Sequence, residues 1–382
     1  MLDNKSIILT VTNDLTHDRR MFRICTSLAE AGAEVVLVGR RWKDSKSFDP
    51  PGFKGVRLKC IFNKGPLFYI EFNKRLFLYL ITHKYDVVCA CDLDTALAVR
   101  WASFFKRSKS VYDAHEFFTE VPELIGRPII KRIWEWIGRI TIPGFNLRYT
   151  VGEELASLMG KKYNVDFQVI RNIAPHKQIQ TESIPIENRK KILLYQGALN
   201  VGRGLEDCIK AVSMLPDWEF WLAGEGDITD QLKNLTTKLN LEQRVNFLGW
   251  VHPDDLPALM NQAKLGINMR ETGSLNDFYS LPNKFFDCIH AGLPSINMNY
   301  PEYKTVNDKY PCSILIDEVS PESIVSTIQH LDLHPEEMIR MSKACSDATK
   351  EFTWEKESEK LTKYYKNLLS PIVHEKGRIQ KV

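Results

Sequence analysis

The sequence predicts an α/β protein with two domains, each built around a parallel sheet. Short apolar strand patterns alternate with helix patterns along most of the chain, as they do in β-α-β units. A polar break at residues 171–190 interrupts this alternation and indicates an interdomain linker. With 382 residues and 44% hydrophobic composition, the chain is long enough to bury two cores.

The strand patterns of the first half each precede a polar loop or a helix pattern. We expect strands at 7–11, 34–38, 85–90, 110–117 and 145–151, the last of them ending the first sheet. In the second half we expect strands at 192–196, 218–223 and 265–269. Residues 352–368 show an amphipathic helix pattern.

Composition excludes several classes of protein. The eight cysteines include no C-x-x-C pair and stand mostly in apolar surroundings, which indicates reduced thiols. The N-terminus enters a strand pattern without a signal peptide, and no apolar run approaches the roughly 20 residues of a membrane-spanning helix. Neither repeats nor nucleic-acid motifs are found. We therefore expect a cytoplasmic protein that binds no nucleic acid.

Residues 279–294 carry the strongest signal for ligand binding. Ser280 as a cap, Pro282 in the first turn and Gly292 as a stop predict a helix of about three turns. Its polar side holds a lysine and a carboxylate one turn apart. A helix N-terminus with free N–H groups suits a diphosphate, although an ordinary surface helix would show the same pattern.

Three residues of this helix are candidate ligands of a nucleoside diphosphate. Lys284 and the amides near Asn283 would face phosphate, and Asp287 would face the ribose hydroxyls. In the loop after strand 192–196, glycines that begin with Gly197 allow close approach to a phosphate, and Arg203 can bind its oxygens.

Polar residues also follow strands of the first domain. Asp18 and Arg19 lie in the loop after the first strand, and the strand from residue 110 ends in His115 and Glu116. Ligands of open α/β sheets bind at such carboxyl-end loops. A capping aspartate, an exposed arginine and a structural histidine are the competing interpretations.

Asp92 and Asp94 match the metal-binding D-x-D pattern, in which paired carboxylates hold a divalent ion against a diphosphate. Asp94 would equally suit the start of the following helix. We expect no metal site.

The first half of the chain is the basic half. Residues 1–170 carry 26 Lys plus Arg against 19 Asp plus Glu, a net +7, whereas residues 171–382 carry 25 against 29, a net −4. The helix predicted at residues 128–142 has isoleucines on one stripe, two tryptophans and several basic residues. It suits either the core of the first domain or the surface of an anionic membrane.

Residues 281–294 resemble the L-P-N-K-x-F-E-Y-x-x-A-G-x-P block of family 4 glycosyltransferases (glycosyl transferases group 1). Residues 111–116 resemble the family block V-Y-D-x-H-E, and residues 245–251 resemble V-x-F-L-G-x-V. The resemblance implies the GT-B fold, in which two Rossmann-like domains face each other across a cleft and a C-terminal helix returns to the N-terminal domain. It implies an acceptor domain over 1–170, a linker over 171–190, a nucleotide-sugar domain over 191–350 and a helical tail over 351–382.

The resemblance also implies the roles of site residues. His115 and Glu116 would be catalytic, and Asp18 and Arg19 would form an N-terminal contact loop. The implied donor-binding residues are Gly197, Arg203, Gly224, Trp250, Gly273, Ser274, Asn283, Lys284 and Asp287.

Three positions depart from the family pattern. Tyr279 and Asp287 stand in place of the two family glutamates, and Ala198 in place of a phosphate-binding arginine. One cation is thus missing, and Lys284 would share its task.

The expected activity is that of a retaining, metal-independent hexosyltransferase without a cofactor. It would move a sugar from a UDP- or GDP-linked donor to a hydroxyl of a cell-envelope glycan or lipid-linked acceptor, at the inner face of the cytoplasmic membrane. A sugar-nucleotide 2-epimerase of the same fold, a catalytically silent partner subunit and a GT-A enzyme remain as alternatives.

Overall fold

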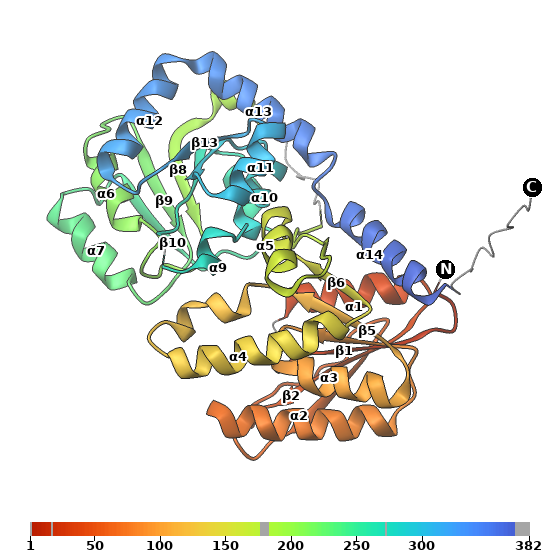
Figure 1. The fold of residues 1–382 in the computed structure, drawn as a ribbon. Coiled ribbons are helices and arrows are strands. Elements are labelled where there is room, and N and C mark those ends of the chain that lie inside the picture. The colour runs from red at the N-terminus through yellow and green to blue at the C-terminus, as the bar shows by residue number, and fades with distance from the viewer. Residues whose placement is uncertain (1, 17, 176–182, 272, 371–382) are drawn as a thin grey trace, which may run out of the picture.

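The computed structural model describes residues 2–16, 18–175, 183–271 and 273–370 (Figure 1). Within them the chain forms two parallel sheets, of seven and six strands, both covered by helices. The predicted α/β class with two Rossmann-like domains is therefore confirmed.

The first sheet has the strand order β3-β2-β1-β4-β5-β6-β7, and all its strands are parallel. Its strands are β1 (Ser6–Thr10), β2 (Glu34–Arg41), β3 (Lys54–Lys59), β4 (Val87–Cys91), β5 (Lys109–Ala114), β6 (Leu147–Thr150) and β7 (Gln168–Val169). The helices of this domain are α1 (Arg19–Glu30), α2 (Gly65–Thr82), α3 (Leu93–Lys106), α4 (Pro128–Thr141) and α5 (Glu153–Tyr163). Short 3₁₀ helices are η1 (Phe118–Glu120), η2 (Pro122–Leu124) and η3 (Ile142–Gly144).

The second sheet has the order β10-β9-β8-β11-β12-β13, again all parallel. Its strands are β8 (Lys190–Gln196), β9 (Glu219–Ala223), β10 (Val245–Gly249), β11 (Ala263–Asn268), β12 (Ser295–Met298) and β13 (Ser313–Ile316). The helices that follow the linker turn η4 (Ile186–Asn188) are α6 (Leu205–Ser213), α7 (Thr229–Lys238), α8 (Leu256–Met260), α9 (Leu275–Phe278), α10 (Asn283–His290), α11 (Pro301–Lys309), α12 (Pro321–Leu333), α13 (Pro335–Thr349) and α14 (Trp354–Leu369).

Both faces of the first sheet are buried, so its central strands are continuously apolar. Ile8 and Val88 join the core under α2, α3 and α4, whereas their neighbours Ile7 and Val87 join the core under α1. Successive residues of a strand point to opposite faces, so one apolar run supplies both cores. The prediction that strand 145–151 ends this sheet was wrong, because β7 pairs beyond β6. At two residues, β7 is too short to produce a sequence pattern.

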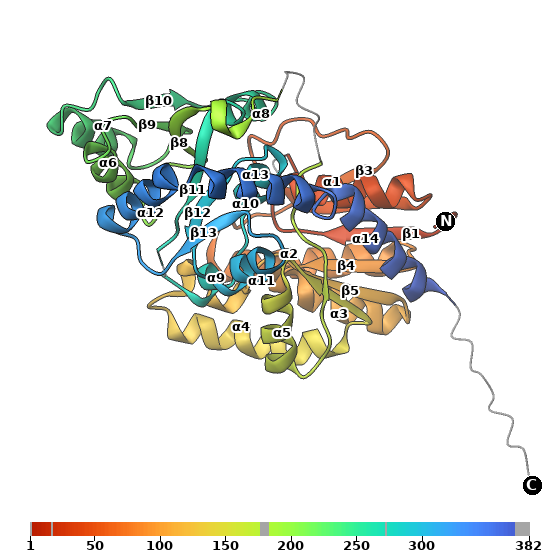
Figure 2. The same ribbon diagram turned by 90° about the horizontal axis from the view of Figure 1, so that it is seen from above.

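The C-terminal helix returns to the first domain, as expected for the fold. In Figures 1 and 2, α14 lies along α1. Trp354 Nε1 donates a hydrogen bond to Ser27 Oγ at 3.0 Å, and Leu361 and Tyr365 are fully buried in the α1 core. Glu357 is also fully buried and accepts from the Arg171 backbone N–H at 3.0 Å. The tail thus fastens the start of the linker to the first domain.

Two further contacts join the domains. Glu302 at the start of α11 is buried, and its carboxylate accepts the free N–H groups of Leu155 (2.9 Å) and Glu153 (3.2 Å) at the start of α5. Asn276 of α9 accepts from the Phe117 N–H at 2.8 Å. Since orphan N–H groups at a helix start need an acceptor, the second domain supplies the cap of a helix in the first.

The predicted domain limits stay a prediction, since the linker falls partly outside the described residues. β7 ends at Val169 and β8 begins at Lys190. Among the described residues, no helix combines the length and apolarity that crossing a membrane requires.

The buried carboxylate of Glu357 should be a strong determinant of stability. Glu357→Ala leaves the buried Arg171 guanidinium, 3.7 Å away, with less compensation, and we expect a loss of about 3 kcal/mol in the free energy of unfolding. Glu355, which is exposed two residues before Glu357, is the matched control, and Glu355→Ala should cost less than about 0.5 kcal/mol. Urea unfolding of the three proteins measures both values, and equal stability of the two variants would contradict the prediction.

Candidate active site between the two domains

Two adjoining hollows, each of about 420 Å³, lie between the domains. One extends along α8 and α10 to Asp287, and the other extends to His115. They share residues from both domains: Asp18, Arg19, Arg23 and Asn283. The sequence-predicted residues of the first strand loop and of the L-P-N-K helix are therefore brought together in one crevice.

Asp18 positions the start of α1 in this crevice. Its Oδ1 accepts from the Met21 N–H at 2.9 Å, and its Oδ2 accepts from Asn13 Nδ2 at 2.6 Å. The carboxylate thus caps the helix, which places the exposed Arg19 at the first helical position, on the wall of both hollows.

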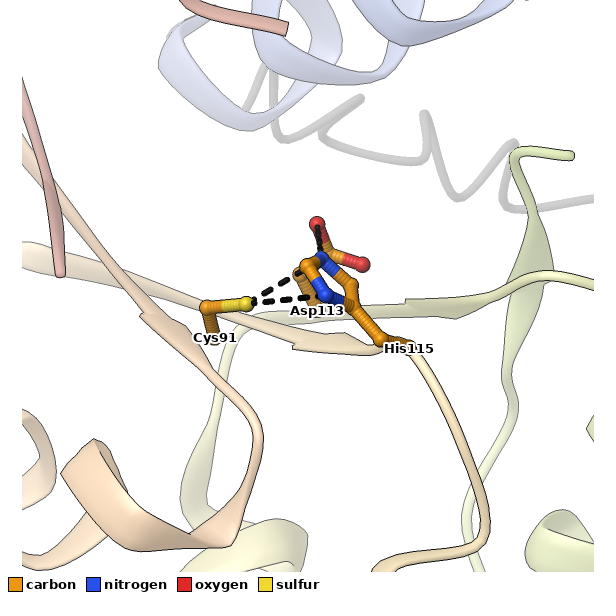
Figure 3. Close-up of side chains that lie close together, drawn as sticks. All are labelled: Cys91, Asp113 and His115. Carbon is orange, nitrogen blue, oxygen red and sulfur yellow. Dashed lines mark hydrogen bonds and ion pairs between the residues drawn. The ribbon is translucent and has the colours of Figure 1, made fainter. Parts of the chain in front are cut away.

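Cys91, Asp113 and His115 lie close together where β4 and β5 end (Figure 3). His115 Nε2 is 3.2 Å from Asp113 Oδ2. Asp113 Oδ1 accepts from Arg20 Nη2 at 2.9 Å, and Arg20 Nη1 donates to the Ile170 carbonyl at 3.2 Å. Asp113 is fully buried, so Arg20 compensates its charge and fixes the orientation of the histidine ring.

Asp92 lies on the other side of the same ring. Its Oδ1 accepts from the His115 N–H at 2.9 Å, and its Oδ2 is 3.8 Å from His115 Nδ1. The backbone of Asp92 has φ +59°, a region that costs energy for a residue other than glycine. The strained backbone of Asp92 places its carboxylate beside the second ring nitrogen of His115.

Burial and charge shift the pKa values around this histidine in a consistent way. Burial lowers the pKa of His115, but the carboxylates of Asp113 and Asp92 outweigh it, so that the pKa is raised. Burial raises the pKa of Asp92 to about 8 and also raises the pKa of Glu116. The raised pKa favours the protonated ring, which can donate hydrogen bonds to the carboxyl groups on both sides.

Glu116 is engaged at the domain interface. Its Oε2 accepts from Asn276 Nδ2 at 3.4 Å, next to the bond between Asn276 and the backbone of Phe117. The predicted catalytic pair therefore faces two ways: His115 lines a hollow, whereas Glu116 contacts the second domain.

The carboxylates of the D-x-D pattern are used in protein contacts. Asp94 Oδ2 accepts from Thr12 Oγ1 at 2.5 Å, while Asp92 binds the backbone of His115. Burial raises the pKa of Asp94 to about 6. This arrangement links β1, β4 and β5 at their carboxyl ends.

Among the described residues, Cys91, Asp113 and His115 bring potential metal-ligand atoms within 4.8 Å of one another. Arg20 already compensates Asp113. Cys91 Sγ is 3.4 and 3.1 Å from the two ring nitrogens, whereas a shared metal would use one of them. The cluster is better explained as the charge network that orients His115.

The helix that opens the second half of the crevice begins later than expected. α10 starts at Asn283 with Pro282 as its N-cap, and its predicted cap, Ser280, donates instead to the Asp277 carbonyl at 2.9 Å. The helix is eight residues long, shorter than the three turns predicted. Gly292, with φ +58°, stops it as predicted. The Phe285 N–H donates to the Pro282 carbonyl at 3.1 Å, and the preceding N–H groups of α10, which have no side-chain cap, can face a ligand.

Asp287 faces the crevice one turn into α10. It lines the first hollow, and its Oδ2 accepts from Gln196 Nε2 at 2.9 Å. Burial raises its pKa to about 6. A carboxylate that is buried, oriented by an amide and open to a hollow suits hydroxyl groups as ligands.

Lys284 lies against the glycine loop that follows β8. A Cβ added to Gly197 would lie 2.9 Å from Lys284 Nζ, so the glycine at φ +121° allows this contact. Lys284 Nζ donates to the Tyr195 hydroxyl at 2.8 Å. Gly224 packs against the other side of the Gly197 loop, since a Cβ added to Gly224 would lie 2.0 Å from the Gly197 carbonyl oxygen. The Lys284 ammonium therefore lies directly beside the backbone of the Gly197 loop.

Burial, together with the positive charges of Arg203 and Arg270, lowers the pKa of Lys284 to about 7. A buried ammonium beside two guanidinium groups is unfavourable unless an anion joins it. Arg270 also contacts Asp277, whose Oδ2 accepts from the Ser274 hydroxyl at 3.1 Å. Ser274 caps α9, so this predicted donor-binding residue also has a structural role next to these cations.

Three other predicted positions are placed as follows. Gly273 precedes α9, and a Cβ there would lie 3.5 Å from Asp277 Oδ2. Trp250 is 67% exposed after β10, and Pro253 of the same loop lines the first hollow. Tyr279, at the departure from the family pattern, packs against the core of the first domain.

Sequence reasoning missed several residues of the site. Arg20, Asp113, Tyr195, Gln196 and Arg270 stand at strand ends or at a helix start, where periodicity does not single them out. Asp113 lies within the V-Y-D-x-H-E block, but that block assigned a role only to His115 and Glu116. The one available signal was charge inside an apolar strand pattern, as at Asp113. Such a residue needs a buried partner, although the sequence cannot say which.

Comparison with known proteins identifies the family. The description "Glycosyltransferase Family 4" matches residues 18–175, and "Glycosyl transferases group 1" matches residues 176–350. The two models together cover both domains, and the chain belongs to the GT-B glycosyltransferases of family 4. Over 84 residues it is 32% identical to an uncharacterized glycosyltransferase of Methanocaldococcus jannaschii, a stretch that spans 21% of this chain and 22% of that relative.

Solved structures agree on the fold. Sucrose-phosphate synthase from Thermosynechococcus elongatus superposes with a TM-score of 0.75 at 14% identity, covering 95% of this chain and 99% of that one. Anabaena HepE in complex with UDP and glucose superposes with a TM-score of 0.71 at 14% identity, covering 94% and 99%. At these identities the likeness establishes the GT-B architecture alone.

The charge network predicts how His115 titrates. Asp92→Asn removes one of the two carboxylates that raise the pKa of this ring, so the imidazolium should lose its proton at a lower pH than in the wild-type protein. NMR titration of the His115 Cε1–H signal measures the shift. Asp86→Asn, at a partly exposed carboxylate before the amino end of β4 and thus at the opposite end of the strands, serves as control. An unchanged midpoint in the Asp92 variant would contradict the pairing.

Proposed function

We propose that the protein is a retaining glycosyltransferase that moves a hexosyl group from a nucleotide sugar to an acceptor hydroxyl without a metal ion or cofactor. UDP is the first choice of nucleotide, because the similarly folded HepE binds UDP and glucose. A GDP-linked donor is the second choice.

One observation carries the proposal. The Lys284 ammonium lies in a partly buried site beside Gly197, near the positive charges of Arg203 and Arg270 and at the start of α10, which has no side-chain cap. A nucleoside diphosphate would satisfy these cations and the free amides together. One turn away, Asp287 would accept from the ribose hydroxyls.

The same groups would assist the chemistry. As the sugar leaves, negative charge grows on the diphosphate, and fixed cations and amides stabilise that charge without a metal. His115, oriented by Asp113 and Asp92, would donate to a hydroxyl of the sugar or acceptor. Arg19 and Arg23, on the opposite wall, would also face the ligand.

For the acceptor we propose a cell-envelope glycan or a lipid-linked sugar. The net +7 of residues 1–170 favours an anionic acceptor or a membrane carrying one. The protein would then act in the cytoplasm at the inner face of the cytoplasmic membrane.

A sugar-nucleotide 2-epimerase is the second candidate. It needs acid and base groups at the sugar, and Asp92 and Glu116 beside His115 both have raised pKa values. A catalytically silent subunit would be the third, since Tyr279 replaces a family glutamate.

The deciding experiment incubates the protein with UDP- and GDP-sugars in EDTA, with and without a lipid-linked or glycan acceptor. Sugar transfer only in the presence of acceptor supports the proposal. Turnover to an epimer without acceptor would favour the epimerase, and loss of transfer in EDTA that manganese restores would favour a GT-A mechanism.

Removal of a phosphate-binding cation should weaken donor binding. A charge-assisted contact is worth about 1.5 to 3 kcal/mol, so Arg203→Ala should raise the Kd for UDP by about tenfold or more. Arg244 is unsuitable as a control, because it binds the backbone carbonyls of Val212 and Leu215. Lys238 is exposed on α7, away from the site. Lys238→Ala is therefore the control for loss of charge. Unchanged affinity in Arg203→Ala and Lys284→Ala together would remove this phosphate site.

Binding of UDP should take up a proton on Lys284. In the free protein its pKa of about 7 leaves the amine mostly neutral at pH 8, and a bound diphosphate raises that pKa. Affinity should therefore fall as pH rises above 7, while the ammonium is present at lower pH in both states. Calorimetry at pH 8 in buffers of different ionisation enthalpy counts the protons. Equal uptake by Lys284→Ala would assign the proton to another group.

A further inference from the structure

Helices α2, α3 and α4 cover one face of the first sheet (Figure 1), and several large apolar side chains of this layer are exposed. At the end of α3, Trp101, Phe104 and Phe105 are 50%, 59% and 63% exposed. Phe104 and Phe105 contact each other edge to face, with ring centroids 5.7 Å apart. Three large aromatic side chains in water on one helix indicate a surface that is covered in use.

Helix α4 continues this surface. Trp134 and Ile137 bury one of its faces against the first domain, whereas Ile129, Ile133 and Trp136 on the other are 73%, 52% and 58% exposed. The core interpretation of this helix therefore holds for one face, and the membrane-surface interpretation stays a prediction for the other. The buried face fixes α4 to α3, and the exposed face has no packing partner within the described chain.

A cationic hollow of about 640 Å³ lies where α3 ends and η3 follows α4. Arg100, Arg107 and Lys109 line it, and its lining contains no carboxylate. Arg100 packs onto Gly144, where a Cβ would lie 2.0 Å from its Nε. Within the described ranges, the side chains of Arg107 and Lys109 make no hydrogen bond or ion pair. Three cations without a counter-charge favour an anionic ligand.

Helix α4 joins this hollow to the active site. It begins four residues after η2, close behind the loop of His115, and it ends in η3 at the hollow. Its 14 residues span about 21 Å. One apolar helix face therefore runs from the catalytic loop to the cationic hollow.

We propose that the α3–α4 face docks on an anionic phospholipid bilayer, with a lipid phosphate in the hollow of Arg100, Arg107 and Lys109. Exposed tryptophan, phenylalanine and isoleucine side chains enter the interface, where amphipathic rings and apolar groups are favoured. The cations line a hollow that Phe104 and Phe105 also line, so they fit anionic headgroups, whereas a purely apolar partner would leave them uncompensated. The proposal uses the proposed function for one point, that the membrane presents the acceptor to the crevice.

Vesicle sedimentation at low salt tests this surface with the full-length protein in the absence of nucleotide. Wild-type protein should bind vesicles of phosphatidylglycerol and phosphatidylcholine, and bind phosphatidylcholine vesicles much less. Arg107→Asn with Lys109→Gln should reduce binding by about tenfold or more. Asparagine tolerates the left-handed backbone of Arg107, at φ +52°. Lys233→Gln with Lys238→Gln on α7 removes the same charge from an exposed surface of the second domain.

Phe104→Ser with Trp136→Ser tests the apolar part, and Leu333→Ser with Ile339→Ser, also exposed, is its control. Both α3–α4 variants should lose vesicle binding while keeping the melting temperature and UDP affinity of wild type. Absence of wild-type binding, or equal losses in variants and controls, would overturn the proposal. So would a dimer in light scattering that the Phe104 variant dissociates. UDP binding and transfer to a soluble acceptor are measured separately, so failure here leaves the glycosyltransferase proposal standing.

Discussion

The buried ion pair between Arg20 and Asp113 is the constraint on which the first half of the crevice depends. An uncompensated carboxylate at the end of a central strand would be severely unfavourable, so Asp113 requires Arg20. Because Arg20 also binds the Ile170 carbonyl, the pair fixes α1 against β5 and the end of the sheet. The orientation of His115 follows from it. Helix α1, which carries the crevice residues Asp18 and Arg19, is positioned by the same contact.

The second half of the crevice has the opposite electrostatic character. The first domain surrounds a histidine with carboxylates, whereas the second collects Lys284 with two arginines beside glycine backbone. The first half supplies its own counter-charges for His115, whereas Lys284 in the second half lies near two arginines and forms no ion pair with a carboxylate among the described residues. A sugar nucleotide between them would place its phosphates on the cationic side and its sugar toward His115. In the proposed reaction, each domain would therefore contact a different part of the donor.

The contacts that hold the domains together lie beside the candidate active site. Asn276 binds the backbone next to Glu116, and Tyr279 packs into the core of the first domain. Glu302 caps a helix of the opposite domain, and α14 crosses back along α1. The family's first glutamate has thus been replaced by an aromatic residue that serves the interface. The site is therefore closed by side chains of both domains rather than by either sheet.

The sequence by itself determined the α/β class, the two halves, most central strands and the helix that begins near Asn283. Apolar runs and turn residues are local signals, and the short range of these signals suffices for such elements. The tertiary structure alone decided that β7 extends the first sheet, that Pro282 rather than Ser280 precedes α10, and that both faces of α4 are apolar for different reasons. It also decided the partners of Asp113, Lys284 and Asp287. Those partners are Arg20, Tyr195 and Gln196, and each lies about 90 residues away along the chain. Pairing over such separations depends on which strands lie side by side with their carboxyl ends at the same edge of the sheet, and no local sequence pattern encodes this arrangement.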